Sequence, residues 1–127
     1  MSFTLRLELI LLSSLLCVAA PAQAQEVEVA TNLICDTQKQ VERFVALYDG
    51  AAEAAISAVN AAEHNPTACG MATAAFVRGP QLATARNKRA TFNIVQVLVL
   101  ALVTEAGVES VTPAAFFSLV PVEELPV

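Results

Sequence analysis

The clearest periodic pattern in the chain lies between residues 37 and 63, where apolar positions recur at helical spacing. One apolar stripe is formed by Val41, Phe44, Val45 and Tyr48. This i, i+3, i+4, i+7 spacing predicts a helix from about Thr37 to Tyr48, with Thr37 and Gln40 as a capping box at its start. A second, alanine-rich helix is predicted from Ala51 to Glu63, because alanine has the highest helix propensity. Asn65-Pro66 ends this helix, so the pattern predicts a helical hairpin.

The pattern changes to that of strands after residue 70. Met71 to Val77 is a short apolar run that ends at a turn signal, Arg78-Gly79-Pro80, and Leu82 to Arg86 either continues it or pairs separately. The β-branched residues of Thr91 to Thr104 favour a strand over a helix, and Val108 to Val120 is predicted to be the last strand. Short turns between consecutive strands indicate an antiparallel meander.

Together these elements predict an α+β fold, with an N-terminal helical hairpin packed on a three-stranded, or slightly larger, antiparallel β-meander. The preceding segment, Gln25 to Asn32, is polar and is expected to be mobile or loosely paired. The strand Thr91 to Thr104 is apolar on both faces, with Val95, Val97 and Val99 on one side and Ile94, Leu98 and Leu100 on the other. Two helices cannot cover both faces, so either the sheet curls around itself or a second chain covers the free face. We therefore also predict an unknown protein partner, or a homodimer, at an apolar sheet face.

The first 24 residues have the pattern of a cleavable secretory signal peptide. Arg6 precedes an apolar run from Leu7 to Ala20, and Ala22 and Ala24 are the small residues that a signal peptidase accepts. The run is shorter than the roughly 20 residues that span a bilayer, so no stable membrane insertion is expected after signal removal. The pattern predicts a periplasmic or secreted protein with one domain, residues 25–127, that ends in a mobile acidic tail from Glu123 to Val127.

Export changes the interpretation of the three cysteines. Cys17 would be removed with the signal peptide, which leaves Cys35 and Cys69 as an even pair in an oxidising compartment. A disulfide between them would close a loop of about 35 residues and stabilise the domain by roughly 4 kcal/mol. The alternative is a redox-active or metal-binding thiol pair, which the long spacing and the lack of a Cys-x-x-Cys motif disfavour.

The distribution of charge narrows the classes of partner. The chain has 12 acidic and 7 basic residues and a formal net charge of −5, which argues against general nucleic-acid binding. Four basic residues nevertheless lie close together in the sequence: Arg78, Arg86, Lys88 and Arg89. They flank a predicted hairpin turn and could contact an anionic partner such as an acidic protein, the alternative being an ordinary solvated turn.

Few residues point to catalysis. His64 is the only histidine, and its place at the end of the second predicted helix favours a contact with the helix dipole over a role as ligand or base. Ser57, Ser110 and Ser118 lack the Gly-x-Ser-x-Gly setting of a hydrolase nucleophile, and the four glycines form no phosphate-binding loop. We therefore predict no catalytic residue, no metal site and no cofactor, and expect that the protein is not an enzyme.

Four segments resemble a set of small exported proteins from alphaproteobacteria: residues 33–37 (Leu-Ile-Cys-Asp-Thr), 41–45 (Val-Glu-Arg-Phe-Val), 77–79 (Val-Arg-Gly) and 113–117 (Pro-Ala-Ala-Phe-Phe). The resemblance implies a bacterial source, and no activity is attached to that set. The sequence as a whole predicts a small exported, disulfide-bonded protein that acts as a non-enzymatic binding or interaction module. The alternative is an accessory or inhibitor protein that contacts an acidic partner through the basic hairpin Arg78–Arg89.

Overall fold

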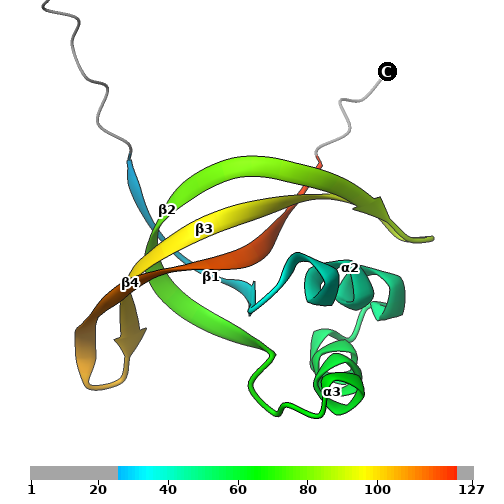
Figure 1. Cartoon of the computed structure of the whole chain (residues 1–127), viewed down its shortest axis with the longest axis horizontal. Coiled ribbons are helices and arrows are strands. Elements are labelled where there is room, and N and C mark those ends of the chain that lie inside the picture. The colour runs from blue at the N-terminus through cyan, green and yellow to red at the C-terminus, as the bar shows by residue number, and fades with distance from the viewer. Residues whose placement is uncertain (1–25, 123–127) are drawn as a thin grey trace, which may run out of the picture.

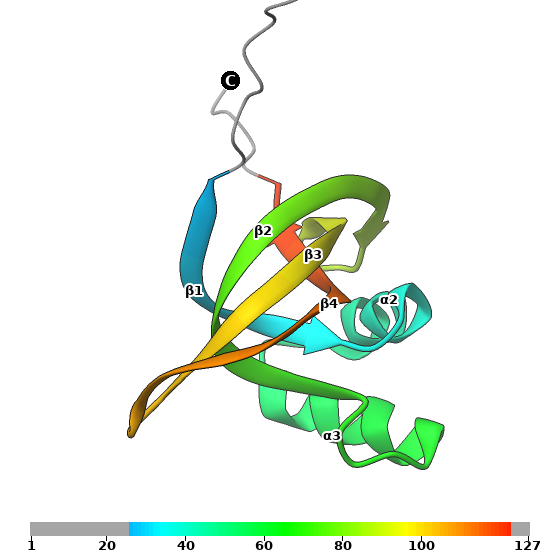
Figure 2. The ribbon, with the colours of Figure 1, turned by 60° about the vertical axis from the view of Figure 1, so that its left-hand side comes forward.

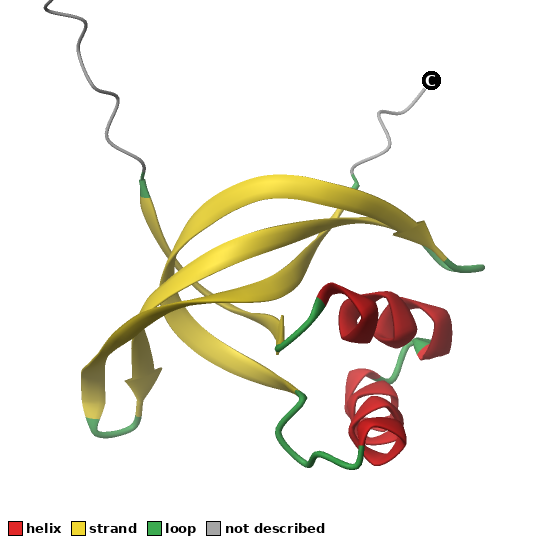
Figure 3. Ribbon diagram, viewed as in Figure 1, coloured by secondary structure: helices red, strands yellow, loops and turns green. Residues whose placement is uncertain are grey.

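The structure is a computed structural model and describes residues 26–122. Within them the chain forms two helices and four strands (Figures 1 and 3). In chain order these are β1 (Val27–Cys35), α2 (Gln38–Leu47), α3 (Ala52–Glu63), β2 (Cys69–Arg86), β3 (Thr91–Thr104) and β4 (Gly107–Pro121). The predicted α+β class is confirmed. The predicted signal peptide, residues 1–24, and the acidic tail, residues 123–127, lie outside the described residues.

Both predicted helices form, with bounds within one residue of those expected. The capping box is present: the Gln40 backbone N–H donates to the Thr37 hydroxyl over 3.3 Å, and the Thr37 N–H donates to Gln40 Oε1 over 3.0 Å. At the end of α3, His64 adopts the left-handed conformation that terminates a helix, with φ 53°. The helical hairpin is therefore encoded by the local sequence.

The segment expected to be loosely paired is a strand instead. β1 pairs with β2 along its whole length, from Val27 opposite Val77 to Cys35 opposite Cys69. The sheet has four strands, which agrees with the expected meander of three strands or slightly more. The helices lie between the first and second strands, so the expectation of a helical hairpin ahead of all the strands was wrong. β1 is hard to recognise because Ala30 and Asn32, which are small or polar, occupy positions where a buried strand usually has larger apolar residues.

The predicted turn at Arg78-Gly79-Pro80 is also absent, because β2 runs through it. Register shifts between Arg78 and Gln81 and between Gln81 and Ala83 absorb the proline within the strand. Gly79 passes so close to β3 that a Cβ atom there would lie 2.8 Å from the carbonyl oxygen of Gln96. The absence of a side chain at Gly79 thus allows two strands to approach each other closely, which is a common role of glycine within sheets.

The antiparallel sheet curls until its first and last strands meet (Figure 2). β1 and β4 share one bridge, Cys35 opposite Phe117. Next to it, the buried hydroxyl of Ser118 donates to the carbonyl oxygen of Leu33 over 2.6 Å. Two ways to bury a strand with two apolar faces were expected, a sheet that curls around itself or a second chain on the free face. The structure contains the curled sheet.

Curling produces two cores that share β3. On the outer face, α2 and α3 cover the end of the sheet that contains Ile94 and Phe92. On the inner face, the strands enclose a second core of buried Ala74, Phe76, Val95, Val97 and Val99. The helices do not cover all of the outer face, because the Leu98 side chain is 40% exposed. Among the described residues, no helix is long and apolar enough to cross a membrane.

Candidate functional site

The predicted disulfide between Cys35 and Cys69 is confirmed. The two residues are register partners at the end of β1 and the start of β2, with their Cα atoms 4.1 Å apart. The chain leaves the sheet for the helices at Cys35 and returns at Cys69, so the disulfide closes the helical segment at its base. A backbone hydrogen bond of 2.9 Å from Asp36 to the Ala68 carbonyl extends the pairing by one residue.

Asn60 on α3 holds the same junction through its side chain. Its Oδ1 accepts from the Cys69 backbone N–H over 2.8 Å, and its Nδ2 donates to the carbonyls of Cys69 and Pro66 over 3.0 and 2.9 Å. This amide acts as the hydrogen-bonding partner of the first residue of β2. Asn60 was not recognised from the sequence, because a single asparagine in an alanine-rich helix carries no signal of such a contact.

The turn between β2 and β3 is fixed in the same way by Asn87. Its Oδ1 accepts from the backbone N–H groups of Arg89 and Ala90 over 2.7 and 3.0 Å. Its Nδ2 donates to the carbonyls of Val45 and Tyr48 over 2.8 and 3.1 Å. Since helix C-terminal carbonyls lack partners within the helix, Asn87 satisfies them and holds the turn against the C-terminal end of α2.

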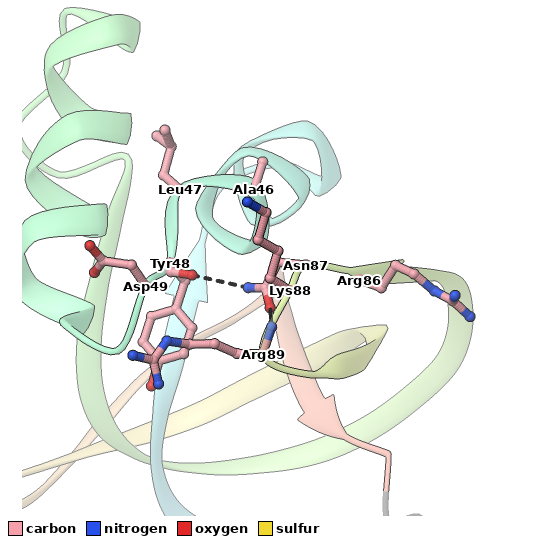
Figure 4. Close-up of a pocket in the computed structure, with 8 residues that line it drawn as sticks. All are labelled: Ala46, Leu47, Tyr48, Asp49, Arg86, Asn87, Lys88 and Arg89. Carbon is pink, nitrogen blue, oxygen red and sulfur yellow. Dashed lines mark hydrogen bonds between the residues drawn. The ribbon is translucent and has the colours of Figure 1, made fainter.

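This contact brings three of the four basic residues singled out from the sequence to one place. We define Arg86, Lys88 and Arg89 as the basic turn. A cleft of about 710 Å³ lies between the basic turn and the end of α2 (Figure 4). It is lined by Ala46, Leu47, Tyr48, Asp49, Arg86, Asn87, Lys88 and Arg89.

The basic side chains take different directions within this cleft. In Figure 4, Arg89 extends toward Tyr48 and Asp49, Lys88 points toward Ala46, and Arg86 points away from the other two. The Arg89 guanidinium packs over Gly50, where a Cβ atom would lie 3.1 Å from its Cζ. Gly50 has a φ of +112°, which also favours glycine at this position. The loop after α2 is therefore shaped to accommodate Arg89.

Arg78 does not belong to this cleft. It lies within β2, and its guanidinium forms a two-pronged ion pair with Glu28 of β1, with nitrogen–oxygen distances of 3.0 and 3.1 Å. The predicted basic hairpin from Arg78 to Arg89 thus separates into a paired arginine in the sheet and the basic turn.

The position of the basic turn has two physical consequences. Cations beside the C-terminal end of a helix are stabilised by its macrodipole, so Lys88 and Arg89 contribute to the stability of the fold. The lining includes a single carboxylate, that of Asp49, and apolar surface from Leu47 and Tyr48. The cleft therefore combines an excess of positive charge with apolar area in a protein of net charge −5.

The other residues weighed for chemistry lie apart from one another. His64 is exposed at the end of α3, Ser57 and Ser110 are exposed, and Ser118 is buried in its hydrogen bond to Leu33. Within residues 26–122, no three histidine, cysteine, aspartate or glutamate side chains gather closely enough to hold a metal ion. Of the residues singled out from the sequence for their chemistry, those of the basic turn are the ones that line a cleft together.

The chain matches no known protein family, no curated protein and no solved structure. The resemblance to small exported proteins of alphaproteobacteria therefore stays a prediction, and the function has to be inferred from the residues of the chain.

Proposed function

We propose that this protein is an exported, non-enzymatic binding module that holds an acidic partner protein in the cleft between α2 and the basic turn. The observation that carries the proposal is the convergence of Lys88 and Arg89 on that cleft, built by the four hydrogen bonds of Asn87. Two elements that are distant in sequence are fixed together there, so the backbone that carries the cations has a defined position rather than the freedom of an isolated loop.

The chemistry of the lining favours binding over catalysis. Guanidinium groups do not release a proton in proteins, and they donate several hydrogen bonds in a geometry that suits carboxylates. Leu47 and Tyr48 add apolar area, and the Leu47 side chain is 46% exposed. A partner segment with one or two carboxylates next to an apolar residue would match both parts of the lining.

The proposed export is supported by the disulfide. Disulfides persist in oxidising compartments and are rare in the reducing cytosol. The Cys35–Cys69 bond closes the segment that carries both helices, and hence one wall of the cleft. A periplasmic or secreted location would keep this bond oxidised and the cleft intact.

A homodimer or partner contact through the sheet has a different candidate surface. A row of apolar side chains crosses all four strands on the outer face, in the register Val27, Val77, Leu98 and Ala115. Val27 is 56% exposed and Leu98 40% exposed, beyond the part of the face that the helices cover. Sedimentation of the wild type and of a Leu98→Lys variant tests this second candidate: a dimer that dissociates in the variant supports it, and a monomeric wild type contradicts the homodimer.

The main proposal is tested with a labelled hexaglutamate peptide as the probe, by fluorescence anisotropy. We expect the wild type to bind it and the Lys88→Glu/Arg89→Glu variant to bind it at least about tenfold more weakly, because two attractive charges become repulsive. The matched control is Lys39→Glu/Arg43→Glu, which changes the net charge equally on exposed residues of α2 that do not line the cleft. Equal weakening in both variants, or no binding by the wild type, would contradict a specific site at the basic turn.

A further inference from the structure

The last described residues of the chain lie at the base of the basic turn. Pro121 of β4 is the register partner of Phe92, and the Val122 backbone N–H donates to the Thr91 carbonyl over 3.0 Å. Thr91 is in turn the register partner of Arg86 across β3 and β2. The row of paired residues thus runs from Arg86 in β2 through Thr91 in β3 to Val122, which directly follows β4.

A second, polar hollow lies at this point. It has a volume of about 210 Å³ and is lined by Arg86, Asn87, Lys88, Arg89, Ala90 and Thr91. Val122 is hydrogen-bonded to one of these lining residues, Thr91. From Thr91 back to Arg89 is two residues, at most about 7 Å of chain. Since neighbouring strands lie about 5 Å apart, whatever follows Val122 in the sequence starts within about 12 Å of Arg89.

The next residues carry the complementary charge. Glu123 and Glu124 follow Val122 directly, and Leu125 comes after them. Glu123 and Glu124 are the first and second residues beyond Val122, so the backbone carries them at most about 7 Å from it, and the long side chains of glutamate, lysine and arginine can span the remaining distance to Lys88 and Arg89. The order of two acidic residues and one apolar residue also matches the cleft, where the cations lie beside Leu47 and Tyr48.

We propose that Glu123 and Glu124 bind the basic turn of the same chain and compete there with the acidic partner. The competition rests on the proposed function, whereas the contact within the chain does not. Because the segment is tethered at Val122, its effective concentration at the basic turn is high, and a weak ion pair suffices to occupy the site much of the time. A partner must displace the segment, so only one with more or better placed carboxylates is held.

The contact is tested with a nitroxide spin label on a Leu125→Cys variant of the isotope-labelled, disulfide-bonded protein. We expect the label to broaden the amide resonances of Asn87 to Thr91 and to leave those of Glu105 to Gly107, in the β3–β4 turn, sharp. Lys88→Glu/Arg89→Glu in the same chain should restore the broadened signals. Absence of broadening at the basic turn, or equal broadening at both turns, would overturn the proposal. Broadening that persists when the spin label and the isotope are on different molecules would assign the contact to a second copy and overturn it as well.

The competition is tested by the affinity for hexaglutamate. Glu123→Gln/Glu124→Gln should bind the peptide about two- to tenfold more tightly than the wild type, a gain that high salt removes. The matched control, Glu105→Gln/Glu109→Gln, makes the same change in net charge at the distant β3–β4 hairpin and should leave the affinity unchanged. Equal gains in both variants, or no gain in either, would overturn the competition. If the spin label reports the contact but no variant binds the peptide, the proposed function fails and the contact within the chain stands.

Discussion

The two cores of the molecule share β3 but are closed by different means. On the outer face, Phe92 and Ile94 pack beneath α2 and α3, and the helices are held to the sheet by the disulfide and by polar side chains. On the inner face, Val95, Val97 and Val99 are enclosed by the other strands of the sheet. A single strand with two apolar faces is thus buried by two solutions, helices on one side and the curled sheet on the other.

The difference lies in what defines the geometry of each core. Asn60 and Asn87 bind backbone groups of Cys69, Val45 and Tyr48, so the helix-side core is held in one arrangement by directional bonds. The inner core relies on apolar packing, on one β1–β4 bridge and on the Ser118 hydrogen bond. Directional bonds fix positions more sharply than non-directional apolar contacts do, and the candidate site lies beside the core that has more of them.

The largest effect is expected from removing the disulfide. Cys35→Ala/Cys69→Ala should lower the free energy of unfolding by about 4 kcal/mol, because the unfolded chain regains the freedom of a closed loop of about 35 residues. Hydrogen exchange should accelerate first in α2 and α3, which lie between the two cysteines, and least in β3. Urea denaturation and amide exchange measure both quantities.

Reduction of the wild type serves as the control for this prediction, since it should reproduce the loss without changing any side-chain volume. A uniform acceleration of exchange in all elements would contradict the comparison, because it would mean that the two cores unfold as one unit and that the disulfide is not specific to the helix side.

A matched pair of phenylalanines compares the two cores directly. Phe44 on α2 and Phe76 on β2 are each 4% exposed, the first in the helix-side core and the second in the inner core. Phe76→Ala should cost about 4 kcal/mol and Phe44→Ala about 3 kcal/mol, because a helix can shift toward the vacated space more easily than a strand hydrogen-bonded on both sides. Urea denaturation of both variants gives the difference, and a larger loss for Phe44→Ala would reverse the assignment of the more rigid core.

Local signals made much of this fold predictable. Thr37 with Gln40, and the run of alanines after Gly50, specify the helices through contacts only a few residues apart. The two cysteines were paired correctly from their number and from the predicted compartment. β1 was missed because its residues become recognisable as a strand only through pairing with β2, more than 30 positions away. The same holds for Gly79-Pro80, whose turn signal is overridden by the bulged pairing of β2 with β3.

The candidate site was predictable in composition and not in geometry. A cluster of cations near position 88 is visible in the sequence, but its association with α2 depends on Asn87, whose side chain reaches residues about 40 positions earlier. The pairing of Arg78 with Glu28 likewise follows from the register of β1 and β2. Contacts between distant segments decide which charges share a site, and a single sequence carries no trace of them.

The smallest expected effect tests the contact between β1 and β4 that closes the sheet around the inner core, which we call the seam. Ser118 is 3% exposed, and its hydroxyl donates to the Leu33 carbonyl beside the one β1–β4 bridge. Ser118→Ala should lower the free energy of unfolding by about 1–2 kcal/mol, because it leaves a buried carbonyl without its donor. Ser110→Ala, at an exposed position of the same strand, is the control and should change stability by less than about 0.5 kcal/mol. Amide exchange in β1 should accelerate in Ser118→Ala while the helices keep their protection, since the disulfide and Asn60 still hold them. Equal acceleration in α2 would show that the seam supports both cores, and the distinction between a core closed by directional bonds and one closed by the curl of the sheet would then fail.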